Sequence, residues 1–338
     1  MTAVTEPLST TQSTQPNRLL ALLRGIVGSQ EFVLFASIIV LLIVVGADSP
    51  RYLAERNLTS ILQGNAYIAV AAIGMAMVII SGNIDISVGS LIGVLATISG
   101  SLAVAGFPIW LSWLAPLFFG ALVGAFNGFL IAYLRIPAIV VTLGMLSILK
   151  GGLIVVTNGQ WITDLPDGYA LSQMRPLGIP MPIYFMVVLT ILAALWMRYS
   201  PTGRAIYAVG GNKEAARLSG ISERRITMTV FIINGVMVGI ASVLFATQLS
   251  VIQSTVPPNL ELTIITVTVV GGVSILGGTG TVIGALFAAI LLSAIGSALV
   301  FIDAIPVFWL RAVQGLLILG TVLADMLRRR RQMLNIRG

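Results

Sequence analysis

Cysteine and histidine are both absent from this chain of 338 residues. Their absence excludes the usual zinc sites, thiolate nucleophiles, histidine-centred triads and histidine-ligated haem. Charged residues are scarce as well, at 9% of the sequence, where a soluble domain has about 25%. A chain with so little polar surface cannot face water on all sides. The composition therefore excludes a cytosolic enzyme, a nucleic-acid-binding protein and a disulfide-stapled secreted domain.

Apolar residues make up 57% of the sequence, and its mean hydropathy is +1.02. Runs of about 20 apolar residues match the ~30 Å hydrocarbon core of a bilayer. They predict an all-α polytopic membrane protein with about ten transmembrane helices, at 32–47, 60–81, 86–105, 109–133, 137–156, 182–197, 226–249, 260–273, 281–302 and 307–326. The eighth run is short and leads into paired glycines. We therefore expect a broken or re-entrant helix within 260–280, covered by protein or by a water-filled cavity.

The basic residues lie mainly between the apolar runs, so the formal net charge of +7 indicates membrane topology rather than nucleic-acid binding. A cytoplasmic N-terminus puts Arg51, Arg56 and Arg175 in outer loops and leaves Lys150 and Arg311 inside spans. The other 14 of the 19 basic residues are then cytoplasmic, namely Arg18, Arg24, Arg135, Arg198, Arg204, Lys213, Arg217, Arg224, Arg225, Arg328, Arg329, Arg330, Arg331 and Arg337. This bias predicts that the N-terminus and the C-terminus are both on the inside.

The predicted organisation is a single membrane domain with two short tails. Residues 1–17 are polar and rich in Ser, Thr, Gln and Pro, which predicts a disordered cytoplasmic tail. Residues 18–327 form the transmembrane domain, and residues 328–338 form a basic cytoplasmic tail. Two connections are long enough to contact a partner, an outer loop at 157–181 and a basic cytoplasmic loop at 198–226.

We do not expect this chain to hydrolyse ATP. A P-loop requires a lysine after glycine and before serine or threonine, whereas Lys150 stands in Leu-Lys-Gly and Lys213 in Asn-Lys-Glu. ATP-driven transport would therefore need a separate subunit to bind and hydrolyse the nucleotide. The chain itself is expected to be no enzyme and to hold no cofactor or metal.

The cytoplasmic loop contains one pattern that suits a partner. Glu214, Ala215 and Ala216 are followed by Arg217 and, three residues later, by Gly220. A short amphipathic helix closed by glycine is suited to docking into a groove on another protein. A basic loop held by anionic lipid headgroups is the equally open alternative.

Small residues at four-residue spacing predict close helix packing. Gly120, Gly124 and Gly128 share one helix face, and so do Gly280 and Gly284. Such faces let two backbones approach each other. We expect them to pack helices within the chain or at the seam of a dimer.

Polar groups inside the apolar runs are candidates for a transport pathway or gate. A charge at the middle of a span costs roughly 2.5–3.5 kcal/mol, so each one needs a reason. The candidates are Asn83, Asp85, Ser87, Lys150 and Glu261. Helix capping by Asp85 or Ser87 and an ordinary first-turn charge at Glu261 are the simpler alternatives. The lack of a chain of intramembrane carboxylates argues against a proton- or sodium-coupled carrier.

Several of these segments together resemble ribose-type ABC importer permeases. Gly-Asn-Ile-Asp-Ile-Ser-Val-Gly-Ser at 82–90 looks like their G-x-D-L-S-V-G-S signature, and 137–145 resembles P-F-I-V-T-L-G-T/M. Lys150 falls where these permeases carry a basic residue, and the sequence from 203 to 216 is similar to their cytoplasmic coupling loop. The glycines of 277–284 match their late Gly-rich motif, so the resemblance covers 57–326 in the family's order.

This resemblance implies a permease subunit of the ribose, xylose and arabinose type in the bacterial inner membrane. It implies a second permease, identical or homologous, two ATPase subunits docked on the coupling loop around 214–221, and an external solute-binding protein. The family's solutes are pentoses, hexoses, deoxysugars, polyols and furanosyl signals. One departure stands at 259–272, where Glu261 is kept but Thr263 replaces the family's acidic residue. That departure fits a specialised or heterodimeric member.

Two other transport functions remain open from the sequence. Branched-chain amino-acid ABC permeases share the hydropathy and the Gly-rich segments, although the signature around Asp85 favours the sugar branch. A stand-alone secondary carrier is disfavoured by the missing carboxylate network and by the docking-type loop. A membrane scaffold without transport activity is the remaining alternative.

Overall fold

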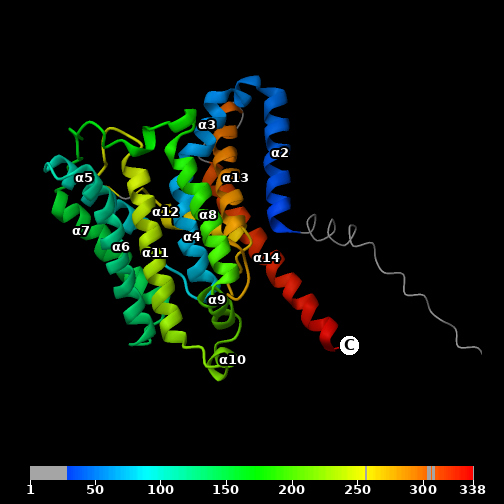
Figure 1. Cartoon of the computed structure of the whole chain (residues 1–338). Coiled ribbons are helices and arrows are strands. Elements are labelled where there is room, and N and C mark those ends of the chain that lie inside the picture. Colours follow the sequence, from blue (N-terminus) through cyan, green and yellow to red (C-terminus); the bar gives the residue numbers. More distant parts are fainter. Residues whose placement is uncertain (1–28, 256, 303–305, 307–308, 338) are drawn as a thin grey trace, which may run out of the picture.

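The computed structural model describes residues 29–255, 257–302, 306 and 309–337, and within them the chain is helical (Figure 1). The expected disordered tail, 1–17, lies outside the described residues. One isolated β-bridge, between Ile162 and Ile252, is the only strand-type pairing in the described part of the chain. The expectation of an all-helical polytopic membrane protein is confirmed.

Seven described helices are long and apolar enough to cross a membrane, one of them formed by two consecutive helices. They are α2 (Gln30–Asp48), α3 (Glu55–Gly64) continued by α4 (Ala66–Ile80), α6 (Ile109–Ala132), α7 (Ala138–Thr157), α8 (Met181–Tyr199), α11 (Glu223–Ala246) and α13 (Val282–Phe301). Three others contain shorter apolar stretches: α5 (Val88–Val104), α12 (Leu260–Val270) and α14 (Trp309–Arg337). The expected tail at 328–338 is helical as far as Arg337, because α14 continues to that residue.

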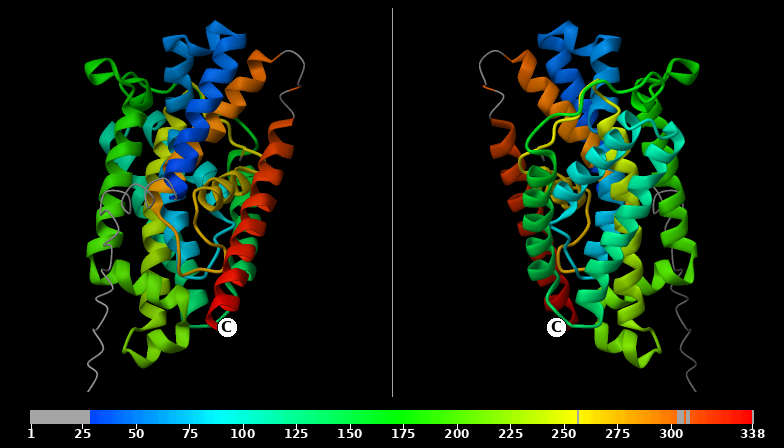
Figure 2. Two further views of the ribbon diagram at one scale, coloured as in Figure 1. Left: turned by 90° about the vertical axis from the view of Figure 1, so that its right-hand side faces the viewer. Right: turned by 90° about the vertical axis from the view of Figure 1, so that its left-hand side faces the viewer.

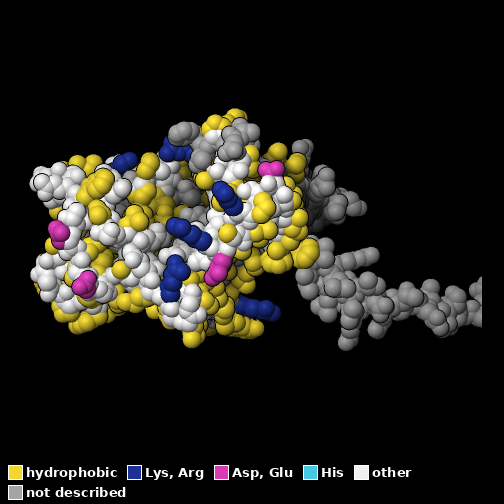
Figure 3. Space-filling model, turned by 90° about the horizontal axis from the view of Figure 1, so that it is seen from above, with side chains coloured by type: hydrophobic (Ala, Val, Ile, Leu, Met, Phe, Trp, Pro, Cys, Tyr) yellow, Lys and Arg dark blue, Asp and Glu magenta, His cyan; other side chains and the backbone are white. Residues whose placement is uncertain are grey.

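The remaining helices cap the two ends of the bundle. At one end lie the 3-10 helices η1 (Pro50–Leu53), η2 (Leu171–Gln173) and η3 (Pro176–Gly178). At the other end lie α9 (Pro201–Gly211) and α10 (Lys213–Leu218), so the long cytoplasmic loop expected at 198–226 is largely helical. Figure 2 shows α14 along one edge of the bundle, and Figure 3 looks down on the α3 end, where charged side chains are few and scattered.

Helix α4 is the centre of the bundle. Every residue of α4 except Tyr67 is buried, and the helix packs against α8, α11, α12 and α13. A helix that is apolar all round is suited to such a position. Other helices instead expose large apolar side chains, among them Phe118 on α6 and Val156 on α7. These outward faces fit the hydrocarbon of a bilayer.

The crossing of α6 and α11 depends on glycine. A Cβ on Gly120 would overlap the carbonyl of Gly235, and a Cβ on Gly124 would overlap the carbonyl of Phe231. A Cβ on Gly128 would lie 3.2 Å from the Cα of Met228, a less severe approach than at the other two glycines. The second predicted glycine face is wrong for Gly280, which precedes α13 and has a φ of +135°, whereas Gly284 lies in α13 against the carbonyl of Gly271.

We expect Gly124→Ala to destabilise the protein, because its methyl group must push α6 away from α11. Overpacking of this kind costs about 1–3 kcal/mol. Gly64→Ala is the matched control, since no atom lies within 4 Å of its Cβ position and alanine favours a helix by about 1 kcal/mol over glycine. The thermal midpoint of the purified protein in detergent should fall for Gly124→Ala only. Equal midpoints for the two variants would contradict this packing argument.

Candidate functional site

A buried polar cluster lies where the chain breaks between α4 and α5. Asp85 is 2% exposed and accepts three hydrogen bonds. The Ser87 amide and hydroxyl donate to Oδ1 over 2.9 and 2.6 Å, and Asn234 Nδ2 on α11 donates to Oδ2 over 2.9 Å. Asn127 Nδ2 on α6 donates to Ser87 Oγ over 3.4 Å. The cluster therefore ties the break to α6 and α11.

The local sequence explains how Asp85 comes to lie inside the protein. Helix α4 ends at Ile80, and Gly82, with φ of +84°, reverses the chain in a conformation that glycine favours. The following residues return into the bundle without helical structure, and α5 begins at Val88. No lysine or arginine of the described chain forms an ion pair with Asp85. Hydrogen bonds from neutral donors are what compensates the burial of this carboxyl group.

Two members of the cluster were not found from the sequence. Asn127 and Asn234 are fully buried, and the carbonyl oxygen of each has no hydrogen-bond partner. Gly74 of α4 lies against Asn234, because a Cβ there would be 2.6 Å from its Oδ1. The available signal was an asparagine in the middle of an otherwise apolar run. Buried polar groups are normally paired, so these two free oxygens are unusual among the buried polar groups of the described core.

The other predicted pathway residues are placed differently. Glu261 begins α12 beside the first turn of α5, since a Cβ on Gly89 would lie 2.7 Å from the Glu261 backbone nitrogen. Asn83 donates to Ser81 Oγ over 3.1 Å and lines a cavity at the α10 end. Lys150 is exposed on α7, away from this cluster. The structure thus brings Asp85 and Ser87 together and leaves Lys150 apart.

The predicted docking residues form a well-capped short helix. Asn212 Oδ1 accepts from the Ala215 amide over 3.0 Å at the start of α10, and Gly220, with φ of +80°, follows its end. Arg217 pairs with Glu214 over 2.6 Å on the exposed surface, and Ala216 is buried. Lys213 pairs with Glu223 over 2.7 Å and so links α10 to the start of α11.

The end of α10 also presents an apolar side chain that the sequence analysis did not single out. Leu218 is 79% exposed, at the end of the bundle where most neighbouring side chains are polar. Leu218 therefore offers an apolar contact surface at an otherwise polar end of the bundle.

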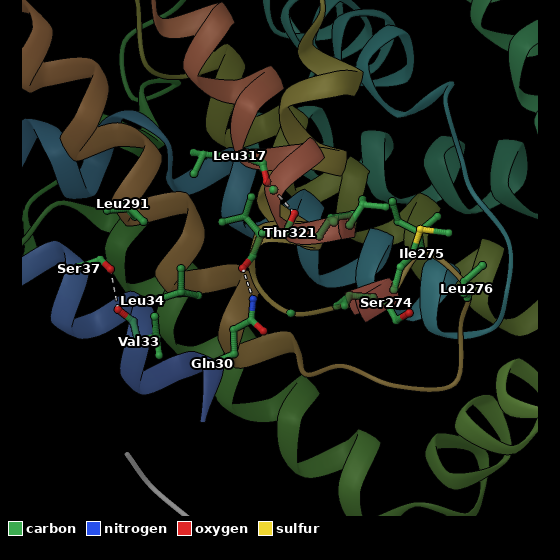
Figure 4. Close-up of a pocket in the computed structure, with 17 residues that line it drawn as sticks. Gln30, Val33, Leu34, Ser37, Ser274, Ile275, Leu276, Leu291, Leu317 and Thr321 are labelled. Atoms are coloured by element: carbon green, nitrogen blue, oxygen red, sulfur yellow. Dashed lines mark hydrogen bonds between the residues drawn. The ribbon is translucent and has the colours of Figure 1, made fainter. Parts of the chain in front are cut away.

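A cavity of about 1080 Å³ opens beside α10. It extends between α6, α7 and the start of α11 as far as Asn83, and four cations line it: Arg135, Lys213, Arg217 and Arg224. The rim of this cavity is exposed to water. A second cavity, of about 540 Å³, lies between α2, α14 and the end of α12 with the segment that follows it, and it is lined mainly by apolar side chains (Figure 4). None of the predicted site residues lines the second cavity.

Comparisons with known proteins identify the family of the chain. Residues 57–322 match the family described as "Branched-chain amino acid transport system / permease component", and the chain belongs to it. It is a permease subunit of an ABC importer, a multi-pass membrane component without an enzymatic site. The resemblance to ABC permeases seen in the sequence is confirmed.

Two relatives match most of the length of the chain. The chain is 37% identical over 305 residues to the autoinducer 2 import system permease protein LsrC of Salmonella typhi, covering 90% of this chain and 88% of that protein. It is 35% identical over 310 residues to the same protein of Photorhabdus laumondii, covering 90% of this chain and 91% of the relative. No solved structure matches the chain.

Proposed function

We propose that this chain imports autoinducer 2 or a closely related small sugar, with ATP hydrolysed by a separate subunit. The observation that carries the proposal is the 37% identity to autoinducer 2 permeases over 90% of the chain. The family's printed description names branched-chain amino acids instead, which makes them the second candidate substrates. The family description and the names of the relatives thus point to different solutes. The relatives carry more weight here, because the chain matches them along nearly their whole length.

Ten spans with both termini in the cytoplasm are the topology that we propose. Counting each of the seven long helices and each of the three shorter apolar helices as one crossing gives ten. With the α10 end inside, the basic residues of α9 and α10 lie in the cytoplasm, as the charge bias of membrane proteins requires. The broken helix in this topology is α12 with the non-helical segment that follows it, and α4 and α13 pack against α12.

A second permease subunit would cover the outer face of α7. Lys150 is exposed about seven residues from the end of that helix, roughly 10 Å along its axis. Gly144, Ser147 and Gly151 lie on the same side of α7, and no other side chain approaches either glycine within 4 Å. Exposure of the charged Lys150 side chain to lipid would cost free energy. A second permease, identical or homologous, together with the solute pathway between the two subunits, would supply polar groups there.

The partners that we propose are an ABC ATPase docked on α10, a second permease and an external solute-binding protein. Purification of the tagged chain from its native membrane in mild detergent should recover all three. Vesicles containing the recovered complex should take up labelled autoinducer 2 only when ATP and the binding protein are present. An excess of unlabelled leucine should leave this uptake unchanged. Uptake of leucine instead would favour the amino-acid alternative, and recovery of the chain without an ATPase would contradict the docking assignment.

A further inference from the structure

Three segments that are far apart in the sequence meet through their backbones at the α10 end. The Gly278 amide donates to the Ile80 carbonyl over 2.8 Å. A Cβ on Gly210 would overlap that carbonyl and would lie 2.7 Å from the Gly278 nitrogen. A Cβ on Gly277 would lie 3.0 Å from the Cα of Gly82 and from the carbonyl oxygen of Gly210. We call this contact of 80–82, 210–211 and 277–278 the backbone junction.

Each segment of the junction belongs to a different part of the transporter. Residues 210–211 end α9 and lead into α10, the proposed docking helix. Residues 80–82 end α4 and open the break that carries Asp85. Residues 277–278 lie in the connection between α12 and α13. The junction therefore joins the docking helix to both non-helical breaks of the bundle.

Two further contacts hold α9 and α10 to the same parts. Tyr207 of α9 donates its hydroxyl to the Gly280 carbonyl over 2.9 Å, in the connection between α12 and α13. The Lys213–Glu223 pair joins α10 to α11, the helix whose Asn234 holds Asp85. Movement of α10 would thus reach the Asp85 cluster from two sides.

The contacts at the junction are between backbone atoms, and this has a mechanical consequence. A contact between side chains can absorb a displacement by rotation about their χ angles, whereas two backbones in van der Waals contact cannot. Close-packed interiors have low compressibility and transmit strain. The glycines permit the approach, and Gly277 and Gly278 additionally adopt φ of +80° and +77°. A displacement of α9 must therefore shift the ends of both breaks.

We propose that the backbone junction is the element through which movement of the docking helix reaches the two breaks, with Gly210 as its main positioning residue. The proposal rests on the proposed function, because it requires an ATPase that moves α10. It makes Gly210 a residue for coupling rather than for solute binding or ATP hydrolysis.

Gly210→Ala and Gly211→Ala form a matched pair for the test. The two glycines are neighbours at the end of α9, yet a Cβ on Gly211 has no atom within 4 Å. Each variant is assembled with the ATPase and the binding protein in vesicles, and both ATP hydrolysis and solute uptake are measured. We expect Gly211→Ala to match the wild type. Gly210→Ala should keep ATP hydrolysis within twofold while uptake per ATP falls at least tenfold.

Uptake per ATP separates coupling from simple stability, because a loss of folded protein lowers both rates together. Equal ratios for Gly210→Ala and Gly211→Ala would overturn the proposal. If Gly210→Ala does not assemble, Tyr207→Phe removes one hydrogen bond without adding volume, and its uptake per ATP should fall two- to fivefold. A wild-type ratio for Tyr207→Phe in that case overturns the proposal too. A wild-type complex without ATP-dependent uptake would instead refute the proposed function itself.

Discussion

Asp85→Ala is expected to abolish ATP-driven uptake and to lower the thermal midpoint of the protein. The substitution removes the acceptor for the Ser87 amide, the Ser87 hydroxyl and Asn234 Nδ2. Each buried donor left without a partner costs about 1–3 kcal/mol, so the total is several kcal/mol. The lost hydrogen bonds include the one that attaches the break between α4 and α5 to α11.

Asp85→Asn and Asn234→Ala separate the parts of this effect. Asp85→Asn keeps the shape and one acceptor oxygen, so we expect a folded protein with uptake reduced by at least tenfold. Asn234→Ala removes the link to α11 but leaves both Ser87 contacts, and it should lower uptake with a smaller loss of stability. Asp167→Ala, at an exposed position of the loop between α7 and α8, is the control and should change neither. Wild-type uptake by Asp85→Ala would refute a role for this cluster in the pathway.

Leu218→Asp is expected to separate the permease from its ATPase without affecting its fold. The side chain is 79% exposed, so the folded chain loses little packing, whereas an apolar pocket on a partner would have to bury a charge. Burying an unpaired carboxylate at such a contact would cost about 2 kcal/mol or more, which is about 30-fold in affinity. Co-purification of the ATPase and ATP-dependent uptake should both be lost.

Leu249→Asp is the matched control for this prediction. Leu249 is 65% exposed and follows α11 at the opposite end of the bundle. The variant should keep the ATPase bound through purification in the same detergent. Thermal midpoints close to the wild type in both variants would show that folding is not the cause. Retention of the ATPase by Leu218→Asp would move the docking site away from the end of α10.

The spans could be predicted from the sequence because the bilayer fixes their length and apolar character. The run 60–81 predicted one crossing, and the structure has α3 and α4 meeting at Asn65. The run 260–273 was expected to be broken, and α12 indeed ends at Val270, before a non-helical segment. Local composition was sufficient in these cases, because each crossing is formed by consecutive residues.

The remaining features depend on contacts between distant residues. Asn234 meets Asp85 across 149 positions of sequence, and the approach of Gly210 to Ile80 requires α9 to fold back under α4. No spacing rule predicts either contact. The helices α9 and α10 could have been predicted more fully, since Ser200 before Pro201 and Asn212 before Lys213 are typical helix starts. The approach of Glu261 to the start of α5, near Asp85 and Ser87, could not be predicted for the same reason.

The shortness of α12 constrains how the protein can be made. Its 11 residues extend about 17 Å, roughly half of a ~30 Å hydrocarbon core. A newly synthesised segment of this length cannot remain in lipid alone, because the polar backbone on either side of it would have no hydrogen-bond partners. Helix α4, in contrast, carries no charged residue and is continued by α3 to a full crossing. During synthesis, α4 can therefore be inserted in the bilayer first. Helix α12 must then enter against the inserted α4 and together with α13, so that the last quarter of the chain inserts as an assembly step.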